Sequence, residues 1–304
     1  MENPFFSIVI ITYNRSHFIL TAINSVINQS YTDWELIIID DGSSDDTESV
    51  ILPFLKDSRI KYFYQSHQKK GVARNNGIKR TTGEYLCFLD DDDYYLENHL
   101  TTFKKYIELT NFPQKTIFYS ERTIKDGDEY KKIPYSYYPS ENKTDNLIYF
   151  GLLEAPANIN TCIHRSFQNE VLFDEIKWVF YVPLYHFILR LLLKDYKLYR
   201  IEEYTSVILQ HGNQMTSDSY KFFKGRYDYI VYFSNLLKLD NHPLIKKKKL
   251  DFLTAIIQCS DNLPDKIKTT FKLIKISPKI IFYRRFWGVI KNIFQHVKTR
   301  LFSR

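Results

Sequence analysis

The sequence has little glycine and cysteine and no long apolar run. It contains 9 glycines and 3 cysteines among 304 residues. Cys87, Cys162 and Cys259 are scattered, odd in number and without C-x-x-C spacing, which supports neither a disulfide framework nor a zinc site. The most apolar segment, residues 179–193, is too short to span a bilayer. Residues 1–6 show no basic region leading into an apolar stretch, so no secretory signal is visible and we expect a cytoplasmic protein.

Acidic residues are missing from the end of the chain. None follows Asp265, whereas 11 of the 42 Lys and Arg residues lie after it. Residues 1–265 therefore hold 31 basic and 35 acidic residues, a net charge of −4, although the whole chain carries +7. This negative charge disfavours a nucleic-acid partner for residues 1–265, because a nucleic-acid-binding surface carries positive charge.

The composition is otherwise that of a folded protein. Apolar residues make up 44% and charged residues 25%, which excludes a disordered chain. Aromatic residues are abundant, with 24 Tyr and 23 Phe. This length fits one large domain or two smaller ones.

Over the first 120 residues, apolar runs alternate with helical patterns. Strands that are apolar throughout and alternate with helices indicate a parallel sheet covered on both faces, so we predict an α/β fold. Beyond residue 120 the patterns are less regular until a run of helices begins near residue 220. We predict strands at 5–12, 34–39, 59–65, 85–89 and 116–120; helices at 16–29, 45–55, 72–80, 96–110, 183–194, 222–237, 246–259 and 266–274; and a loop at 130–146.

Polar clusters follow three of the predicted strands, at Thr12–Asn14, Asp40–Gly42 and Asp90–Asp93. Ligands of open α/β sheets bind at the carboxyl ends of the strands, so three clusters at that edge predict a binding site. Four adjacent carboxylates repel one another unless a cation neutralises them, and oxygen ligands suit Mg²⁺ or Mn²⁺. The alternative for the aspartate run is a solvated acidic loop near a helix N-terminus.

Two of the motifs are weak when each is taken alone. The Asp40–Ser43 segment offers a carboxylate to a base N–H or a ribose hydroxyl, but an ordinary capped turn has the same letters. Gly71–Gly77 opens a helix after two lysines and contains Arg74, a combination that could hold a diphosphate. The alternative is a surface helix, because the segment is neither a Walker loop nor a G-x-G-x-x-G fingerprint.

Together, the segments Ser7–Asn14, Glu35–Asp45, Gly71–Gly77 and Gly83–Asp93 resemble the family 2 glycosyltransferases in order and spacing. The resemblance implies a GT-A fold, a mostly parallel sheet flanked by helices, that binds a nucleotide-diphospho-sugar, most often a UDP-sugar, with Mg²⁺ or Mn²⁺. It also implies transfer with inversion at the anomeric carbon. By motif position it implies Thr12, Tyr13 and Asn14 for the nucleobase pocket, Asp41 as acceptor from the base, Arg74 and Asp91 beside the donor, and Asp90, Asp92 and His211 for the metal, with Asp92 as the direct ligand.

The general base is where the sequence departs from the family. After the Phe-Asp-Glu of residues 173–175, the family usually has a Glu-Asp pair at the start of a helix that contains an Arg. Counting back from Arg190, this pair falls on Pro183 and Leu184, and neither side chain can accept a proton. Proline suits the start of a helix, so we expect the helix without the base. Candidate substitutes are His186, Asp174, Glu175 and Glu154, and the alternative for His186 is a packed helix residue.

The end of the chain, residues 279–304, interleaves apolar and aromatic residues with seven basic ones. Such a pattern is typical of a helix that lies in an anionic membrane interface. The alternatives are a helix packed on the body and, more weakly, RNA binding.

We therefore expect a GT-A domain at 1–215, with a nucleotide-sugar half at 1–120 and an acceptor half at 121–215, and a helical basic extension at 216–304. The predicted activity is transfer of a sugar to a saccharide or lipid-linked acceptor of bacterial surface polysaccharide, at the inner face of the membrane. The alternative is a GT-A domain without a base that binds nucleotide sugar as a partner protein. A nucleotidyltransferase would need a Gly-rich triphosphate loop, and the sequence shows none.

Overall fold

The computed structural model describes residues 3–154, 160–174, 183–212, 218–260 and 262–277, with residues 290, 291 and 293. The chain forms two compact units, residues 1–211 and 212–304. The predicted basic tail at 279–304 lies outside the described residues, apart from those last three, and so does Glu175. Among the helices that the structure describes, none combines the length and apolar character needed to cross a bilayer.

The first four strands of the sheet form its parallel part. Their order is β3-β2-β1-β4, and every neighbouring pair is parallel. Nearly all side chains of β1, β2 and β4 are buried, because helices cover both faces of the sheet. This confirms the predicted α/β fold. The strands are β1 (Phe6–Thr12), β2 (Trp34–Asp40), β3 (Ile60–Tyr64) and β4 (Tyr85–Asp90).

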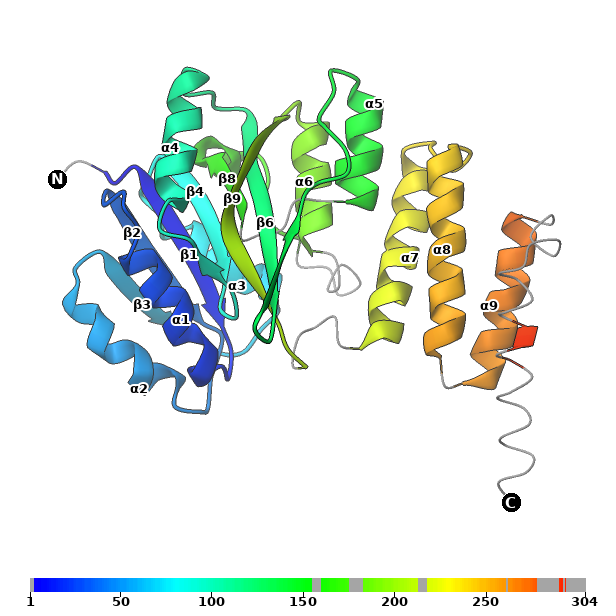
Figure 1. Cartoon of the computed structure of the whole chain (residues 1–304), viewed down its shortest axis with the longest axis horizontal. Coiled ribbons are helices and arrows are strands. Elements are labelled where there is room, and N and C mark those ends of the chain that lie inside the picture. The colour runs from blue at the N-terminus through cyan, green and yellow to red at the C-terminus, as the bar shows by residue number, and fades with distance from the viewer. Residues whose placement is uncertain are drawn as a thin grey trace. The chain divides into compact units, whose positions relative to one another are not determined.

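Helices α1 (Ser16–Ile27), α2 (Thr47–Ile51) and α4 (His99–Leu109) bury apolar side chains against one face of this sheet. Helices α3 (Lys70–Ile78) and α6 (Pro183–Leu193) cover the other face (Figure 1). The predicted helix at 45–55 is too long. It ends at Ile51 and continues as a 3₁₀ segment, η1 (Leu52–Lys56), because Pro53 has no N–H for the next helical bond.

The second half of the sheet is mixed, whereas the parallel pairs predicted from the first 120 residues make up its first half. From β4 the order continues β8-β6-β9-β5, and β7 pairs with β6 alone. Strand β8 is antiparallel to both of its neighbours, whereas β6 and β9 are parallel to each other. The strands are β5 (Tyr94–Tyr95), β6 (Thr116–Asp126), β7 (Glu129–Ile133), β8 (Thr161–His164) and β9 (Lys197–Gln210).

The loop predicted at 130–146 is wrong over much of its length. Strand β7 returns along β6 as a hairpin that turns at Gly127, whose φ is +56°. After an irregular stretch come the short helix α5 (Lys143–Asn146) and a π-helical segment, η2 (Leu147–Leu153), whose apolar side chains are largely buried. The tyrosines and lysines that suggested a loop are compatible with an exposed edge strand.

A link of three residues, Asp91–Asp93, joins β4 in the middle of the sheet to β5 at its far end. Strand β5 is antiparallel to β9, with Tyr94 opposite Val207 and Tyr95 opposite Ser206. The aspartate run therefore starts on one half of the sheet and ends on the other.

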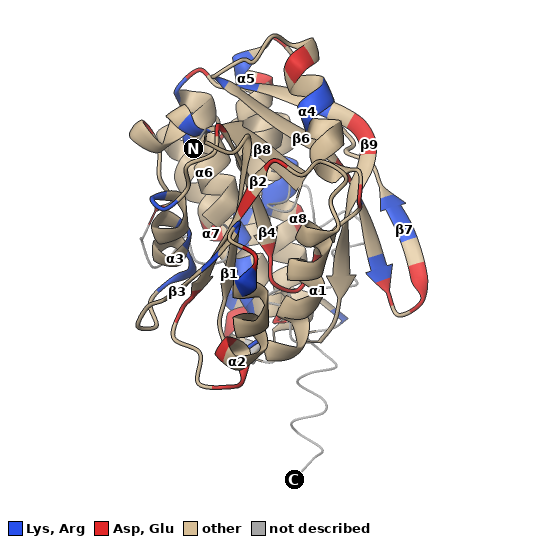
Figure 2. Cartoon of the chain, turned by 90° about the vertical axis from the view of Figure 1, so that its left-hand side faces the viewer, with Lys and Arg blue, Asp and Glu red and all other residues tan. Residues whose placement is uncertain are grey.

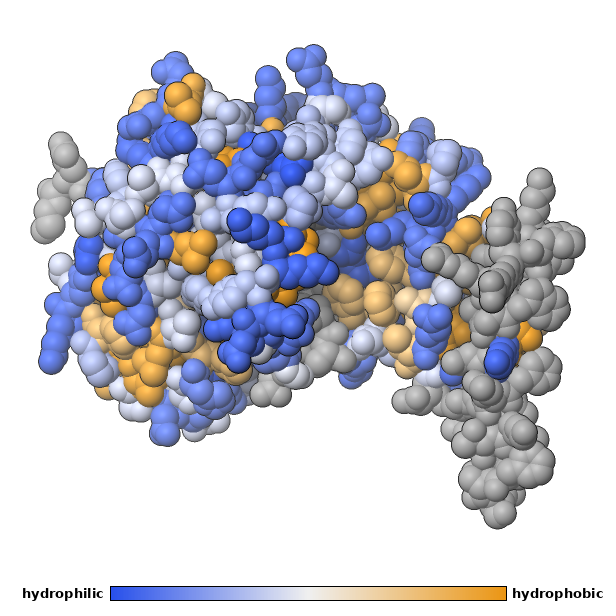
Figure 3. Space-filling model, viewed as in Figure 1, coloured by the Kyte–Doolittle hydropathy of each residue, from blue (hydrophilic) through white to orange (hydrophobic). Residues whose placement is uncertain are grey.

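In the second unit, α8 packs against both α7 and α9. Ile230, Leu253 and Leu273 are buried there, whereas Ile267 and Phe271 of α9 are exposed beside lysines. On the face seen in Figure 3, hydrophobic patches are separated by hydrophilic residues. The three predicted helices of this region are confirmed, each starting a few residues earlier than expected, as α7 (Ser219–Leu236), α8 (Pro243–Cys259) and α9 (Leu263–Ile276).

Candidate active site

The loops after β1 and β2 are tied together at the carboxyl edge of the sheet. Asn14 takes a positive φ of 52°, and its side-chain oxygen accepts from the N–H of Ser44 at 2.7 Å. In return, its own N–H donates to Ser43 Oγ at 2.9 Å. Gly42 has a φ of +89°, and a Cβ at this position would lie 2.6 Å from the backbone N of His67. Only glycine fits this turn, which places Asp41 at the edge.

Asp41 is buried, and His67 links it to Tyr13. Its Oδ1 accepts from the N–H of Gln68 at 3.0 Å and from Gln65 Nε2 at 2.6 Å. His67 Nδ1 lies 3.2 Å from Asp41 Oδ2, and its ring stacks on Tyr13 with centroids 4.0 Å apart. Thr12 is buried beside this turn, whereas Tyr13 is 43% exposed. An aromatic face next to a fixed carboxylate is suited to a nucleobase.

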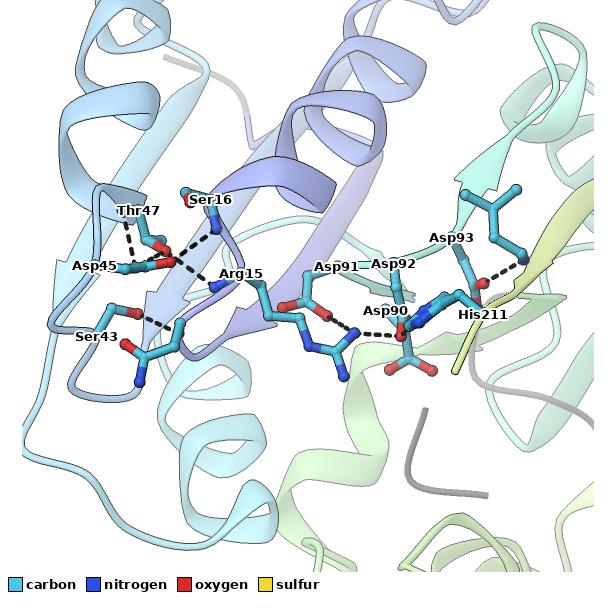
Figure 4. A network of polar contacts seen from close by, with 12 residues as sticks. Arg15, Ser16, Ser43, Asp45, Thr47, Asp90, Asp91, Asp92, Asp93 and His211 are labelled. Atoms are coloured by element: carbon cyan, nitrogen blue, oxygen red, sulfur yellow. Dashed lines mark hydrogen bonds and ion pairs between the residues drawn. The ribbon is translucent and has the colours of Figure 1, made fainter. Parts of the chain in front are cut away.

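Asp90 and Asp92 pair closely with cationic side chains, and Asp91 Oδ1 lies 3.9 Å from Arg15 Nη1 (Figure 4). Asp92 Oδ2 lies 2.5 Å from Arg15 Nη1 and 3.1 Å from His211 Nε2. Asp90 Oδ1 accepts from Arg74 Nη2 at 3.0 Å. Arg74 is 4% exposed, so the alternative of a surface helix for Gly71–Gly77 is wrong.

The other two aspartates are buried. Asp93 Oδ1 accepts from the N–H of Leu209 on β9 at 3.0 Å. Burial and the neighbouring Asp90 and Asp92 raise the pKa of Asp93 well above its usual range. Burial, reinforced by the charge of Asp92, raises the pKa of Asp91 to about 7, while Arg15 opposes the shift. The alternative of a freely solvated acidic loop is therefore wrong for these two residues.

The donor set at Asp90, Asp92 and His211 fits a divalent cation that is shared with a diphosphate. Among the described residues, no group of three or more His, Cys, Asp or Glu side chains is arranged to hold a metal unaided. However, Mg²⁺ and Mn²⁺ usually take only one or two protein carboxylates and complete their shell with phosphate and water. Asp92 and His211, which meet at 3.1 Å, can supply an oxygen and a nitrogen to such an ion.

The segment that contains Asp174 is held against the start of α3. Asn75 bonds the backbone of Phe173 twice, accepting from its N–H at 2.8 Å and donating to its carbonyl at 2.9 Å. Arg74 lies over the Phe173 ring at 5.2 Å. A Cβ at Gly71 would meet the carbonyl oxygen of Asp174 at 2.8 Å, so glycine permits this close approach.

Asp174 and His186 form a pair close to this segment. Asp174 Oδ2 lies 3.6 Å from His186 Nδ1. Burial lowers the pKa of His186 to about 4, against the attraction of Asp174, so its ring is neutral at pH 7. Pro183 and Leu184 begin α6, and Leu184 is buried. Glu154 accepts a hydrogen bond from Ser136 Oγ at 2.8 Å.

Sequence reasoning missed two side chains of the site. Arg15 follows Asn14 directly, and a charged residue just beyond a strand end is a signal that could have identified it. Its partner Asp92 is 77 residues away in the chain. His67 lies in a loop without a motif, and only its stacking on Tyr13 reveals it.

The mixed sheet and its edge site define the GT-A class of glycosyltransferase. TarS 1-349 of S. aureus has a TM-score of 0.62 at 16% identity, covering 98% of this chain and 92% of that one, and its complex with UDP-GlcNAc scores 0.60. The chain belongs to glycosyl transferase family 2, whose family model matches residues 7–170.

Among curated relatives, a GalNAc(5)-diNAcBac-PP-undecaprenol beta-1,3-glucosyltransferase of Campylobacter jejuni is 44% identical over 102 residues, which are 33% of this chain and 33% of that protein. A putative colanic acid biosynthesis glycosyl transferase of Escherichia coli K12 is 29% identical over 237 residues, 75% of this chain and 81% of that protein. Three uncharacterized glycosyltransferases of Rickettsia species match this chain over 106 residues, which are only 15 to 18% of their own length.

Proposed function

We propose that the protein transfers a sugar from a nucleotide-diphospho-sugar, a UDP-sugar, to a saccharide or lipid-linked acceptor, with inversion at the anomeric carbon. The observation that carries the proposal is the edge site, where Asp41 and Tyr13 form a slot for a base and Asp92, Arg15 and His211 form a charged cluster. The undecaprenol-linked substrate in the name of the Campylobacter relative supports a lipid-linked acceptor.

In this reaction, the bond between the anomeric carbon and the diphosphate oxygen breaks, and its electron pair leaves with the nucleotide. Arg74, buried next to Asp90, and Arg15 place positive charge where the diphosphate develops negative charge. Asp90, Asp92 and His211 would hold Mg²⁺ or Mn²⁺, which neutralises the leaving diphosphate when bound.

We assign the general base to Asp174. The acceptor hydroxyl attacks the anomeric carbon from the opposite face, and its proton passes to the Asp174 carboxylate. Asp174 is the more accessible member of its pair, with 23% of its side chain exposed against 7% for His186. The neutral His186 ring lies next to this carboxylate, with Nδ1 3.6 Å from Asp174 Oδ2. This assignment supplies the base that Pro183 and Leu184 cannot.

The test is release of UDP from a panel of UDP-sugars with Mn²⁺. Asp92→Ala should lower the rate at least about 100-fold, because Arg15 and His211 lose their shared partner. Asp174→Asn should lower turnover about 100-fold or more and leave the KM of the donor unchanged. Asp128→Ala, at the exposed turn of the β6–β7 hairpin, is the matched control and should match the wild type.

Absence of UDP release by the wild type from every sugar of the panel would overturn the proposal. If calorimetry then showed UDP binding without turnover, the chain would be a nucleotide-sugar-binding protein that has lost its base. Full activity of Asp174→Asn would contradict only the assignment of Asp174 as the general base and would leave the proposed transfer standing.

We also propose that the protein works at the inner face of the membrane, with residues 279–304 on an anionic surface. Helix α9, just before this segment, supports the proposal, because Ile267 and Phe271 are 42% and 68% exposed beside Lys268 and Lys272. Deletion of residues 279–304 should abolish salt-sensitive co-sedimentation with vesicles of anionic lipid. Unchanged sedimentation of the truncated protein would contradict this placement.

A further inference from the structure

Beyond the donor site, one face of the second half of the sheet presents tyrosines and lysines together. We call it the tyrosine face and define it by Tyr94 on β5, Tyr204 on β9, Lys125 on β6 and Tyr130 and Lys132 on β7. The register shows why these residues share a face. Tyr94, Val207, Thr123 and Lys132 form one cross-strand row, and Leu209, Lys125 and Tyr130 form a row two residues further along the strands. Residues two apart on a strand point to the same side.

Two acidic residues at the end of the hairpin, Asp126 and Glu129, belong to the other face. Asp126 pairs with Glu129 in the row next to that of Lys125 and Tyr130, and side chains in neighbouring rows point to opposite sides. Tyr95, next to Tyr94, is likewise on the other side, because it lies in the apolar core with α1 and α4. The tyrosine face is therefore aromatic and basic.

Contacts within the face hold its rings in place. The hydroxyls of Tyr94 and Tyr130 lie 3.4 Å apart. Lys125 Nζ lies 5.1 Å from the centroid of the Tyr130 ring, and Lys132 Nζ lies 4.9 Å from that of Tyr204. Tyr130 is 58% exposed, and Tyr94 and Tyr204 are half-buried. Aromatic faces with hydroxyl and ammonium donors at their edges match the apolar faces and the hydroxyls of sugar rings.

The tyrosine face continues directly from the acidic cluster. Tyr94 follows Asp93, and the N–H of Leu209 donates to Asp93 Oδ1 at 3.0 Å. Lys125 and Tyr130 lie one and two strands beyond Leu209 in the same row, which is about 10 Å at the usual strand spacing. Figure 2 shows β7 at the outer edge of the sheet, so the face ends in solvent.

We propose that the tyrosine face binds the acceptor saccharide and leads its reacting hydroxyl to the donor. The inference rests on the proposed glycosyl transfer and adds the acceptor subsite to it. The rings of Tyr130 and Tyr204 stack on successive sugar residues, and Lys125 and Lys132 donate to their oxygens.

The experiment measures binding of the full-length protein to an array of bacterial surface oligosaccharides and saccharide-diphospho-lipid mimics, with UDP and Mn²⁺ present. The wild type should bind at least one saccharide, and Tyr130→Ala combined with Tyr204→Ala should weaken that binding at least tenfold. Tyr130→Phe combined with Tyr204→Phe keeps the rings and should retain most of it. Tyr232→Ala, on α7 and 53% exposed, is the matched control and should bind as the wild type does.

Two further measurements keep the outcomes separate. UDP affinity by calorimetry should stay within twofold of the wild type in the double alanine variant. Such a result would show that the nucleotide-sugar half, residues 1–120, is folded in the variant. Undiminished saccharide binding by that variant, or no binding to any saccharide by the wild type, would overturn the proposal that the tyrosine face binds the acceptor. Failure of donor turnover with intact, tyrosine-dependent saccharide binding would instead overturn the proposed transfer alone.

Discussion

The first unit has two halves, residues 1–120 and 121–211, which we call the donor half and the acceptor half after the roles we propose for them. The two halves hold their polar residues in place by different means. In the donor half, backbone N–H groups of loops donate to buried carboxylates: that of Gln68 to Asp41, and those of Thr82 and Gly83 to Glu35, which Ser7 and Lys61 also contact. In the acceptor half, the buried Glu121 on β6 pairs with Arg200 on β9, 79 residues away. The first arrangement follows from the ends of strands, whereas the second depends on the pairing of distant strands.

The largest expected effect is at this buried ion pair. The side chains of Glu121 and Arg200 are 2% and 7% exposed, and Glu121 also accepts from the N–H of Tyr135. Glu121→Gln should lower the free energy of unfolding by about 3–5 kcal/mol, because it leaves a buried guanidinium without its counter-charge. Urea denaturation measures the loss.

The control is Glu203→Gln, which removes the surface pair between Glu203 and Lys105. The side chain of Glu203 is 38% exposed and that of Lys105 is 58% exposed. This substitution should cost no more than about 1 kcal/mol. If the two variants lost the same unfolding free energy, the buried pair of Glu121 and Arg200 would stabilise the protein no more than a surface pair does.

A second test concerns His99 on α4, which connects the two halves. Its ring stacks on Tyr95 at 3.7 Å, and Nδ1 lies 2.8 Å from Thr205 Oγ1 on β9. Burial lowers the pKa of His99 to about 3. The unfolded chain binds a proton below about pH 6.5 and the folded chain does not, so the stability that depends on neutral His99 is present above pH 6.5 and is lost as the pH falls toward 3.

At pH 5 this loss is about 2 kcal/mol relative to pH 7. The difference in unfolding free energy between wild type and His99→Phe should shrink by that amount over this range. His17→Gln, an exposed histidine on α1, should leave the pH profile unchanged. If wild type and His99→Phe lost the same unfolding free energy between pH 7 and pH 5, protonation of His99 would not be what destabilises the fold at low pH.

The smallest expected effect compares two glycines with positive φ, one in each half. Gly127→Ala, in the open turn of the hairpin, should cost about 1 kcal/mol for backbone strain alone, because no atom lies within 4 Å of the added Cβ. Gly42→Ala should cost about 1 kcal/mol more and weaken UDP binding, since its Cβ would meet His67 at 2.6 Å. Thermal unfolding and calorimetry measure both, and equal UDP affinity in the two variants would contradict a donor slot built on this turn.

The same contrast explains what the sequence could predict. The apolar strands and helices of the first 120 residues were readable because their burial repeats locally, and the polar clusters after them lie at one edge, where Asp92 and His211 meet. Strand β9 was missed because its 14 residues mix charged and apolar side chains. The pairing of Arg15 with Asp92 and of His67 with Asp41 could not be predicted, because the two members of each pair come from distant parts of the chain.

The link Asp91–Asp93 has a mechanical consequence. From β4 to β5 the sheet path crosses four strand spacings, about 19 Å if the sheet were flat. The chain from Asp90 to Tyr94 can extend over about 14 Å at most. The sheet must therefore curl between β4 and β5 until these two strands come within reach of each other, and the aspartate link is the tie between them. Any change in the curvature of the acceptor half is transmitted through this tie to the carboxylates of the donor half.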